Sequence, residues 1–179
     1  MEKDKVRIDR LKSKETRHQE FEKIVREYSQ NLYQQIRRMV TWHEDTDDIL
    51  QNTFMKAWKS IDNFRGESPI ETWLYRIAYN ESITFLSKRN RTVPMSELES
   101  VEDYKLESDL YFDGSELQEK FQKALNSLPS KQRAVFNLKY FEEKKYEEIS
   151  KILNTSIGAL KASYHFAVKK IEAYFEEND

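Results

Sequence analysis

Aromatic and cationic side chains that suit a nucleic-acid ligand are concentrated between residues 63 and 91. A predicted loop holds Phe64, Arg65, Gly66, Glu67 and Ser68; the helical stretch after it carries Thr72, Trp73, Tyr75, Arg76, Tyr79 and Asn80, followed by Lys88, Arg89 and Arg91. Unpaired bases stack on aromatic rings, while the phosphate backbone attracts positive charge. The pattern therefore predicts contact with single-stranded DNA.

Core packing is the alternative interpretation of the same aromatic residues. Trp73 and Ile77 are four residues apart, a spacing more typical of a buried helical face, so we assign this pair to the core. Arg76 and Asn80 occupy a different face and are also one helical turn apart. A single DNA strand could meet both, and these two residues carry the prediction.

A second candidate site lies near the C-terminus, where two short helical segments flank the turn at 154–156. The later segment has Ser156 as a capping residue, and its outward side carries Gly158, Lys161, Ala162, His165, Lys169 and Lys170. Small side chains let a helix approach a major groove, and lysines contact phosphates. This pattern favours a DNA-binding helix-turn-helix, with an ordinary helical hairpin as the alternative.

Acidic residues at 44–48 mark a third candidate region. Their simplest role is to cap a helix and to favour its positive end. That role does not require an exposed Gln51 and Phe54 on the following turns, which together with Asp48 form a mixed polar and aromatic strip. Such a strip suits a protein interface.

The composition predicts an all-α protein that needs no cofactor. Its 179 residues include only three glycines and three prolines, too few for the tight turns of a barrel or sandwich. Cysteine is absent, and the three histidines are too far apart in sequence for a local metal motif. No long apolar run or apolar leader occurs, so we expect a cytoplasmic location. No nucleophile and base pair or phosphate-cradling glycine loop suggests an enzyme.

Charge is distributed unevenly along the chain. Residues 1–93 hold 18 Lys and Arg against 15 Asp and Glu, and residues 120–179 hold 11 against 8. Between them, residues 94–119 contain one lysine and nine acids. We therefore predict two mildly basic domains joined by an acidic linker, although the acidic run could simply be a solvated connection.

Hydrophobic periodicity predicts the helices that position these sites. In the first domain we expect a helix over about 18–40. A second should begin after Glu44-Asp45-Thr46 and end at about 61, with Ala57 and Trp58 on its buried face. A third should begin at Pro69, after a Ser68 cap, and end at about 91. In the second domain we expect a helix from about 115 to 128, one after Pro129-Ser130 bearing Ala134, Val135, Leu138 and Phe141, and the pair over 146–153 and from 156 onward.

The combined motifs resemble the extracytoplasmic-function (ECF) group of the sigma-seventy family of bacterial sigma factors. The resemblance spans about Phe21 to Ile171. Its most specific part is the run from Asp47 to Trp58 followed by the run from Phe64 to Asn80, and a second block extends from Leu128 to Lys161.

The resemblance implies a promoter-specificity factor without catalytic activity. Sigma domain 2 would occupy 1–93, the acidic linker 94–116, and sigma domain 4 117–179. The family's clamp-docking helix, which binds the coiled coil of the polymerase's largest subunit, matches Asp47, Asp48, Gln51, Asn52 and Phe54. Its minus-ten site, where DNA melts and a flipped base is held, matches the 64–68 loop with Arg76, Asn80, Lys88, Arg89 and Arg91. Its minus-thirty-five site matches Ser156, Gly158, Lys161, Ser163, His165 and Lys169. An anti-sigma factor is a further implied partner.

Several residues depart from the family pattern. Ala162-Ser163 stands where Ser-Arg is common, Phe166 where an arginine often follows the position of His165, and Asn52 where a glutamate is common. Fewer cations face the upstream duplex, so we expect weak binding by the C-terminal domain alone. Two other interpretations remain: a conventional operator-binding regulator, and a helical interaction protein whose basic patches are incidental.

Overall fold

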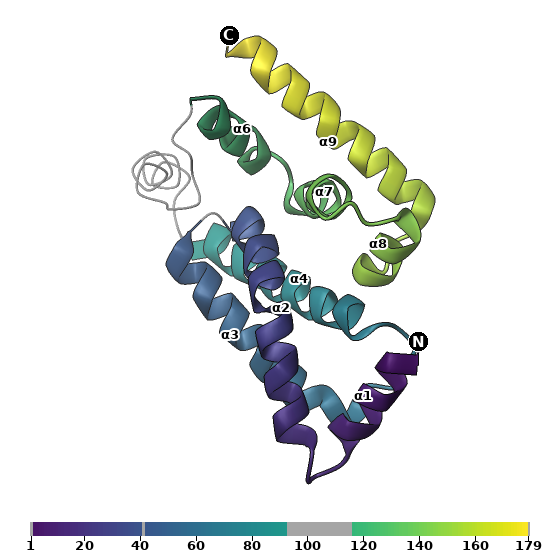
Figure 1. Cartoon of the computed structure of the whole chain (residues 1–179). Coiled ribbons are helices and arrows are strands. Elements are labelled where there is room, and N and C mark those ends of the chain that lie inside the picture. The colour runs from purple at the N-terminus through teal and green to yellow at the C-terminus, as the bar shows by residue number, and fades with distance from the viewer. Residues whose placement is uncertain (1, 41, 93–115, 179) are drawn as a thin grey trace. The chain divides into compact units, whose positions relative to one another are not determined.

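Every regular element in the described part of the chain, residues 2–40, 42–92 and 116–178, is helical in this computed structural model (Figure 1). The predicted all-α class is confirmed for these residues. The predicted linker lies outside them, apart from Glu116. None of the described helices is long and apolar enough to cross a membrane. The elements are α1 Glu2–Lys12, α2 Arg17–Val40, α3 His43–Ser60, η1 Ile61–Asn63, α4 Ile70–Thr92, α6 Glu116–Asn126, α7 Ser130–Phe136, η2 Asn137–Phe141, α8 Tyr146–Leu153 and α9 Ile157–Glu177.

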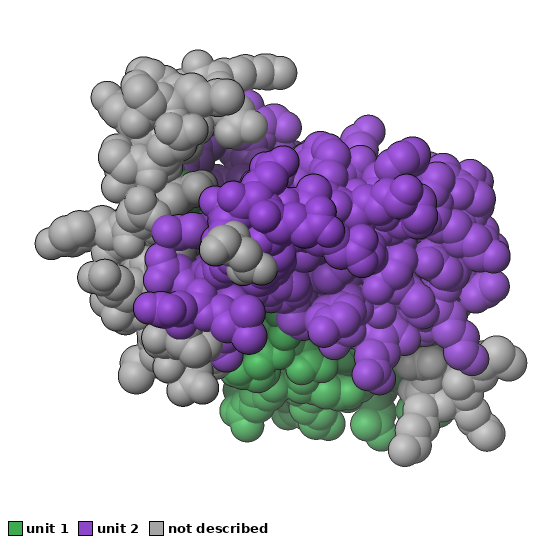
Figure 2. Space-filling model, turned by 90° about the horizontal axis from the view of Figure 1, so that it is seen from above, with its two compact units in different colours: residues 1–82, 151–153 green, residues 83–150, 154–179 purple. Residues whose placement is uncertain are grey.

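The chain divides into two compact units, which Figure 2 colours separately. The first consists of residues 1–82 with 151–153, and the second of residues 83–150 with 154–179. The division after residue 82 lies within α4. The domain boundaries at 93 and 117 remain a sequence-based prediction.

The core of the first unit is built on the hairpin of α2 and α3, which lie side by side (Figure 1). The most deeply buried apolar side chains of α2 are Ile24, Leu32, Ile36 and Met39, each at most 1% exposed. Burial of each such side chain contributes roughly 1.5–3 kcal/mol relative to leaving it in water. This hairpin gives α3 a fixed orientation, with one face buried and the other in solvent.

Two details of the first unit differ from the sequence-based prediction. The second helix begins at His43 rather than after Thr46, because Trp42 acts as the N-cap and its carbonyl accepts from both the backbone N–H and the hydroxyl of Thr46. The helix predicted from Pro69 begins one residue later, and the Pro69 carbonyl accepts its first backbone hydrogen bond, from Trp73.

The helix α1 was not predicted. Leu11 is 1% exposed, and Arg7 pairs with Glu20 and Glu27 of α2, its Nε lying 3.0 Å from the Glu20 carboxylate. Burial raises the pKa of Glu20, but the Arg7 hydrogen bond and the nearby Lys23 outweigh it and lower the pKa overall. The Arg7 hydrogen bond also lowers the pKa of Glu27. These ion pairs and the buried leucine fix α1 against α2.

Aromatic rings dominate the core of the second unit. Phe136 stacks on Tyr140 and on Tyr164 with ring centroids 5.1 and 5.7 Å apart, and Phe121 packs edge-on against Phe136. The helix predicted to run through Phe141 ends its α-helical part at Phe136 and widens into a π-helical turn over Asn137–Phe141. Side chains are buried continuously from Arg133 to Leu138, and the last two of them, Asn137 and Leu138, lie in the π turn, which accommodates an extra residue.

Candidate functional site

The solvent face of α3 carries the predicted protein-binding residues. Asp47, Asp48, Gln51 and Asn52 are all exposed, and Asp47 lies 3.1 Å from the His43 ring. Met55 continues this face one turn further and is 47% exposed. We call Asp48, Gln51, Asn52 and Met55 the α3 strip. Sequence reasoning missed Met55, although its spacing of four residues from Gln51 would have placed it on the same face.

Phe54 and Trp58 do not have the environments that the sequence suggested. Phe54 was expected to be exposed but is half-buried, with its ring edge-on to Phe21 at 6.4 Å between centroids. Trp58 was expected on the buried face but is 38% exposed. Its indole lies 5.0 Å from the Phe21 ring and 6.1 Å from the His18 ring, measured between centroids. The α2 helix supplies both ring partners, which the α3 periodicity alone could not reveal.

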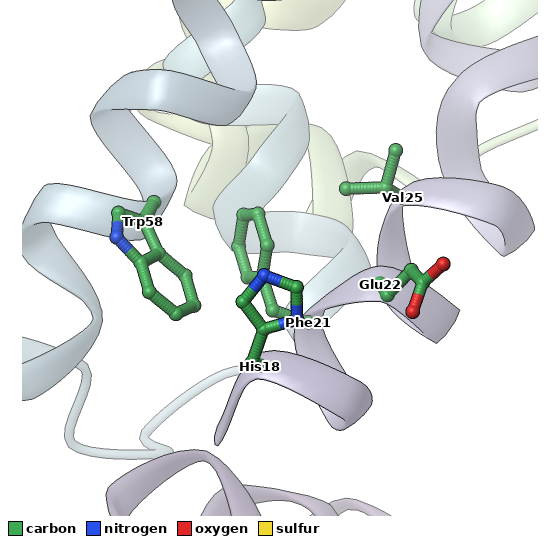
Figure 3. A pocket seen from close by; sticks show the side chains of 5 residues that line it. All are labelled: His18, Phe21, Glu22, Val25 and Trp58. Atoms are coloured by element: carbon green, nitrogen blue, oxygen red, sulfur yellow. The ribbon is translucent and has the colours of Figure 1, made fainter. Parts of the chain in front are cut away.

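An open apolar pocket of about 400 Å³ lies between α2 and α3 (Figure 3). Figure 3 shows His18 and Phe21 on α2 turned toward Trp58 on α3. The pocket extends along α2 past Glu22 to Val25. It leaves apolar surface accessible next to the α3 strip.

The loop between η1 and α4 is anchored by Phe64, which is only 6% exposed and stacks on Trp73 at 4.7 Å. Gly66 adopts a left-handed conformation with φ of 73°, and a Cβ added there would lie 2.7 Å from Ile8 of α1. Arg65, Gly66 and Glu67 are exposed, while Ser68 is half-buried. The buried Phe64 therefore supports a short exposed turn. Residues of this loop and of α4 line one shallow hollow. They include Phe64, Arg65, Glu67, Ser68, Trp73 and Arg76.

The first turns of α4 separate the aromatic and cationic residues by face. Arg76 and Asn80 are exposed one turn apart, as the sequence predicts. Thr72 and Tyr75 are buried, so their inclusion among the DNA-facing residues was wrong. They lie on the side of α4 that faces the core, where Leu74 and Ala78 are also buried.

The basic end of α4 is described only in part. Lys88 is exposed and Arg89 half-buried; Arg91 belongs to the helix, but its side chain lies outside the described residues. Lys56 of α3 pairs with Glu81 of α4, which fixes the middle of α4 relative to α3.

The C-terminal helix pair has the predicted bounds, with α8 over Tyr146–Leu153. Asn154 ends it in the left-handed conformation, with φ of 49° and ψ of 50°, which asparagine tolerates better than most residues. Ser156 then caps α9 by accepting a hydrogen bond from the Ala159 N–H at 3.4 Å. The capped three-residue turn is typical of a helix-turn-helix.

The outward face of α9 carries the predicted duplex-binding residues. Gly158, Lys161, His165 and Lys169 are exposed, and Ser163 is half-buried. On the opposite face Leu160, Ala167 and Ile171 are buried. The Lys161 ammonium lies 5.8 Å from the Tyr146 ring centroid, so α8 supports its orientation. Sequence analysis noted Phe166 only as a departure from a pattern; its side chain is 54% exposed.

Among the described residues, no group of three or more His, Cys, Asp or Glu side chains is placed to hold a metal ion. The fold and the exposed surfaces define an all-α protein with a capped helix-turn-helix, a motif typical of DNA-binding proteins, and a mixed polar and apolar strip exposed on α3.

Comparison with known proteins identifies the family. The model for sigma-70 region 2 matches residues 24–92, and the model for sigma-70 region 4 matches residues 118–171. The chain is 30% identical to the ECF RNA polymerase sigma-E factor of Haemophilus influenzae, with 85% of each chain covered. It is 27% identical to the protein of the same name in Escherichia coli (strain K12), covering 94% of this chain and 92% of that one.

A solved structure agrees with these matches. The sigma factor RpoE of Bartonella quintana, determined in complex with the anti-sigma factor NepR, superposes with a TM-score of 0.67 at 27% identity, covering 87% of this chain and 96% of that one. The chain therefore belongs to the ECF sigma factors of the sigma-70 family. It is a promoter-specificity factor that binds core RNA polymerase and directs transcription initiation at promoter DNA.

Proposed function

We propose that the exposed surfaces of this sigma factor divide promoter recognition into three tasks. The α3 strip, with Asp47 and Phe54 beside it, docks on the largest-subunit clamp coiled coil of the polymerase. Its acidic beginning and exposed Gln51 and Met55 support this role, because protein interfaces combine an apolar centre with polar groups. This strip therefore contributes affinity for the polymerase and does not take part in reading the DNA bases.

The loop at 64–68 and the exposed residues of α4 act on the minus-ten element. The buried Phe64 anchors the turn, and Gly66 allows its left-handed backbone, so an extruded base meets a preformed surface. Arg76 and Asn80 lie one turn apart and can contact successive groups of a single strand. Lys88, Arg89 and Arg91 add positive charge for the backbone. Phe64 acts through the loop it supports, since its own ring is buried.

The outward face of α9 reads the minus-thirty-five element as a duplex. The single observation that carries this assignment is the Ser156-capped helix whose small and cationic residues are exposed together: Gly158, Lys161, His165 and Lys169, with Ser163 at the edge. The helix fits a major groove, and its lysines contact phosphates. Sigma domain 2 would end near residue 93 and sigma domain 4 begin near 117, close to the matched ranges 24–92 and 118–171.

An anti-sigma factor is a further proposed partner. The Bartonella relative was determined with such a protein. The polymerase forms the phosphodiester bonds, and this chain supplies recognition and strand separation in the cytoplasm.

Two substitutions test the division of tasks. Asp48→Arg reverses a charge on the α3 strip and should weaken binding to core polymerase at least tenfold, about 1.4 kcal/mol. Arg76→Ala should leave assembly unchanged and reduce promoter opening. Core binding is measured with fluorescently labelled factor, and opening by permanganate reactivity of minus-ten thymines. Glu177→Arg, an equal charge reversal outside these surfaces, is the control. Normal assembly and opening by both test variants would contradict the assignment.

A further inference from the structure

Phe166 is a large apolar side chain in solvent on the helix assigned to DNA. It is 54% exposed, while its neighbour Ala167 is fully buried in the core. The cluster of rings and aliphatic side chains that forms the core of the second unit does not include it. Its ring lies 5.9 Å from the ring of its sequence neighbour His165, measured between centroids. Packing within the unit therefore does not account for its position.

The helix surface next to Phe166 carries small apolar side chains. Ala159, Ala162 and Phe166 follow one another at spacings of three and four residues, which places them along one stripe of the helix. All three are exposed. A Cβ added at Gly158 would meet nothing within 4 Å, so the surface beside the stripe is also open. The Phe166 ring is therefore accessible to a partner that approaches along this stripe.

Charge indicates what kind of partner approaches this stripe. Between Ser156 and Ile171 the helix contains three lysines and no acid. Lys161 and Lys169 are exposed on the turns before and after Phe166. A polyanion is favoured over a typical protein surface, because the phosphates of a duplex satisfy the lysines that lie before and after Phe166 along the helix.

The chemistry of the ring limits which base it can read. A phenyl group has no donor or acceptor, so it cannot bond the O6 and N7 atoms by which guanine is recognised in the major groove. It can contact the C5-methyl group of thymine, the one apolar group that the bases present there. Phe166 lies nine residues after the first residue of α9, roughly 14 Å along the helix axis.

We propose that Phe166 is a specificity-determining residue that selects a thymine in the upstream duplex element through its C5-methyl group. The inference rests on the proposed function of α9. One position of the upstream element would therefore be an A·T pair, recognised through an apolar contact with the thymine methyl group. The His165 ring lies beside the Phe166 ring, tilted by 57° to it.

The test uses holoenzyme assembled from core polymerase and the full-length factor. Promoters with a randomised upstream element are selected for binding with the unmodified chain, with Phe166→Ala, and with Leu117→Ala as a control, since Leu117 is an exposed apolar residue outside α9. The unmodified chain and the control should select thymine at one position. Phe166→Ala should lose this preference there and keep the selection elsewhere.

The selected thymine is then replaced by deoxyuridine, which removes only the methyl group. Binding by the unmodified chain should weaken about fourfold, equivalent to the roughly 0.8 kcal/mol of one buried methyl group. Binding by Phe166→Ala should not change on this replacement. Equal effects of deoxyuridine on both proteins, or a uniform loss of affinity across all sequences in Phe166→Ala, would overturn the inference and leave the role of α9 intact. No upstream selectivity in the unmodified holoenzyme would overturn both.

Discussion

Gly66 and Gly158 occupy opposite situations, and substituting each by alanine should have opposite effects. At Gly66 the φ of 73° lies in the left-handed region that a residue with a Cβ adopts only under strain, so Gly66→Ala should destabilise the protein by about 1–2 kcal/mol, although the Ile8 methyl group 2.7 Å from the added Cβ can move aside. At Gly158, in helical backbone with open space around it, Gly158→Ala should stabilise by about 0.5 kcal/mol. Urea unfolding of both variants measures the difference. A stability loss at Gly158 equal to that at Gly66 would contradict the geometry.

Glu143 has a positive φ of 50° between the π turn and α8. A residue with a Cβ is strained in this conformation by roughly 1–2 kcal/mol, whereas glycine is not. Glu143→Gly should therefore stabilise the protein by about 1 kcal/mol, after the greater freedom of glycine in the unfolded chain is deducted. Thermal unfolding should show a rise of roughly 2–4 °C. Glu142→Gly, at a φ of −95°, is the control and should lower the melting temperature.

At the scale of elements, the attachment of α1 depends on ionised carboxylates. Arg7 holds the pKa of Glu20 and Glu27 below the ordinary value of 4.5, against the opposing effect of burial, which is the largest influence on Glu20. A lowered pKa in the folded state means that the stabilisation is complete above about pH 4.5 and is lost as the pH falls through the folded-state values. The ion pairs should therefore contribute fully at pH 7 and disappear in acid.

Arg7→Gln should lower the free energy of unfolding by about 1–2 kcal/mol at pH 7, a value reduced because Arg7 and Glu27 are partly exposed. It should also flatten the fall in stability between pH 5 and pH 3, which urea titrations at several pH values measure. Arg26→Gln breaks an exposed pair with Glu22 and should cost less than about 0.5 kcal/mol. Identical pH profiles for Arg7→Gln and the unmodified chain would show that the Arg7 ion pairs do not stabilise the attachment of α1.

Sequence periodicity predicted most helices because the apolar residues of each helix face the core of its own unit. The bounds of α8 and the Ser156 cap of α9 followed from local spacing. The helix α1 was missed because its mean hydropathy is low and ion pairs with α2 hold it, and such long-range partners leave no periodic signal. The π turn was missed for a similar reason, since burying Asn137 depends on packing across the unit.

The candidate site was predictable where residue type alone decides exposure. Arg76, Asn80, Lys161 and Lys169 are exposed as expected, because charged and amide side chains seldom lie in a core. Aromatic residues were less predictable, since a ring can serve either a core or an interface. Phe64 and Tyr75 are buried, whereas Trp58 and Phe166 are exposed, and each outcome depends on neighbours supplied by other elements.

At the scale of the whole molecule, a net charge of −2 conceals opposite charges that serve different partners. The segments 1–93 and 120–179 each carry an excess of three positive charges by the counts above. The second of them includes the acid-free stretch of α9 from Ser156 to Ile171. A duplex therefore meets locally positive surface despite the overall acidity, and binding to promoter DNA should weaken steeply as salt rises.

The acidic segment 94–119 has one lysine and nine acids, and this charge should act after the polymerase is bound. Negative charge repels nucleic acid but can occupy a positively charged channel through which nucleic acid passes. Replacing the acids of this segment by their amides should leave the affinity for core polymerase unchanged, because the proposed docking residues lie on α3. It should alter the yield of short initial transcripts and the rate of promoter escape, measured by gel analysis of transcription in vitro. Unchanged initial transcription and escape would reduce the segment to a solvated connection between two DNA-binding units.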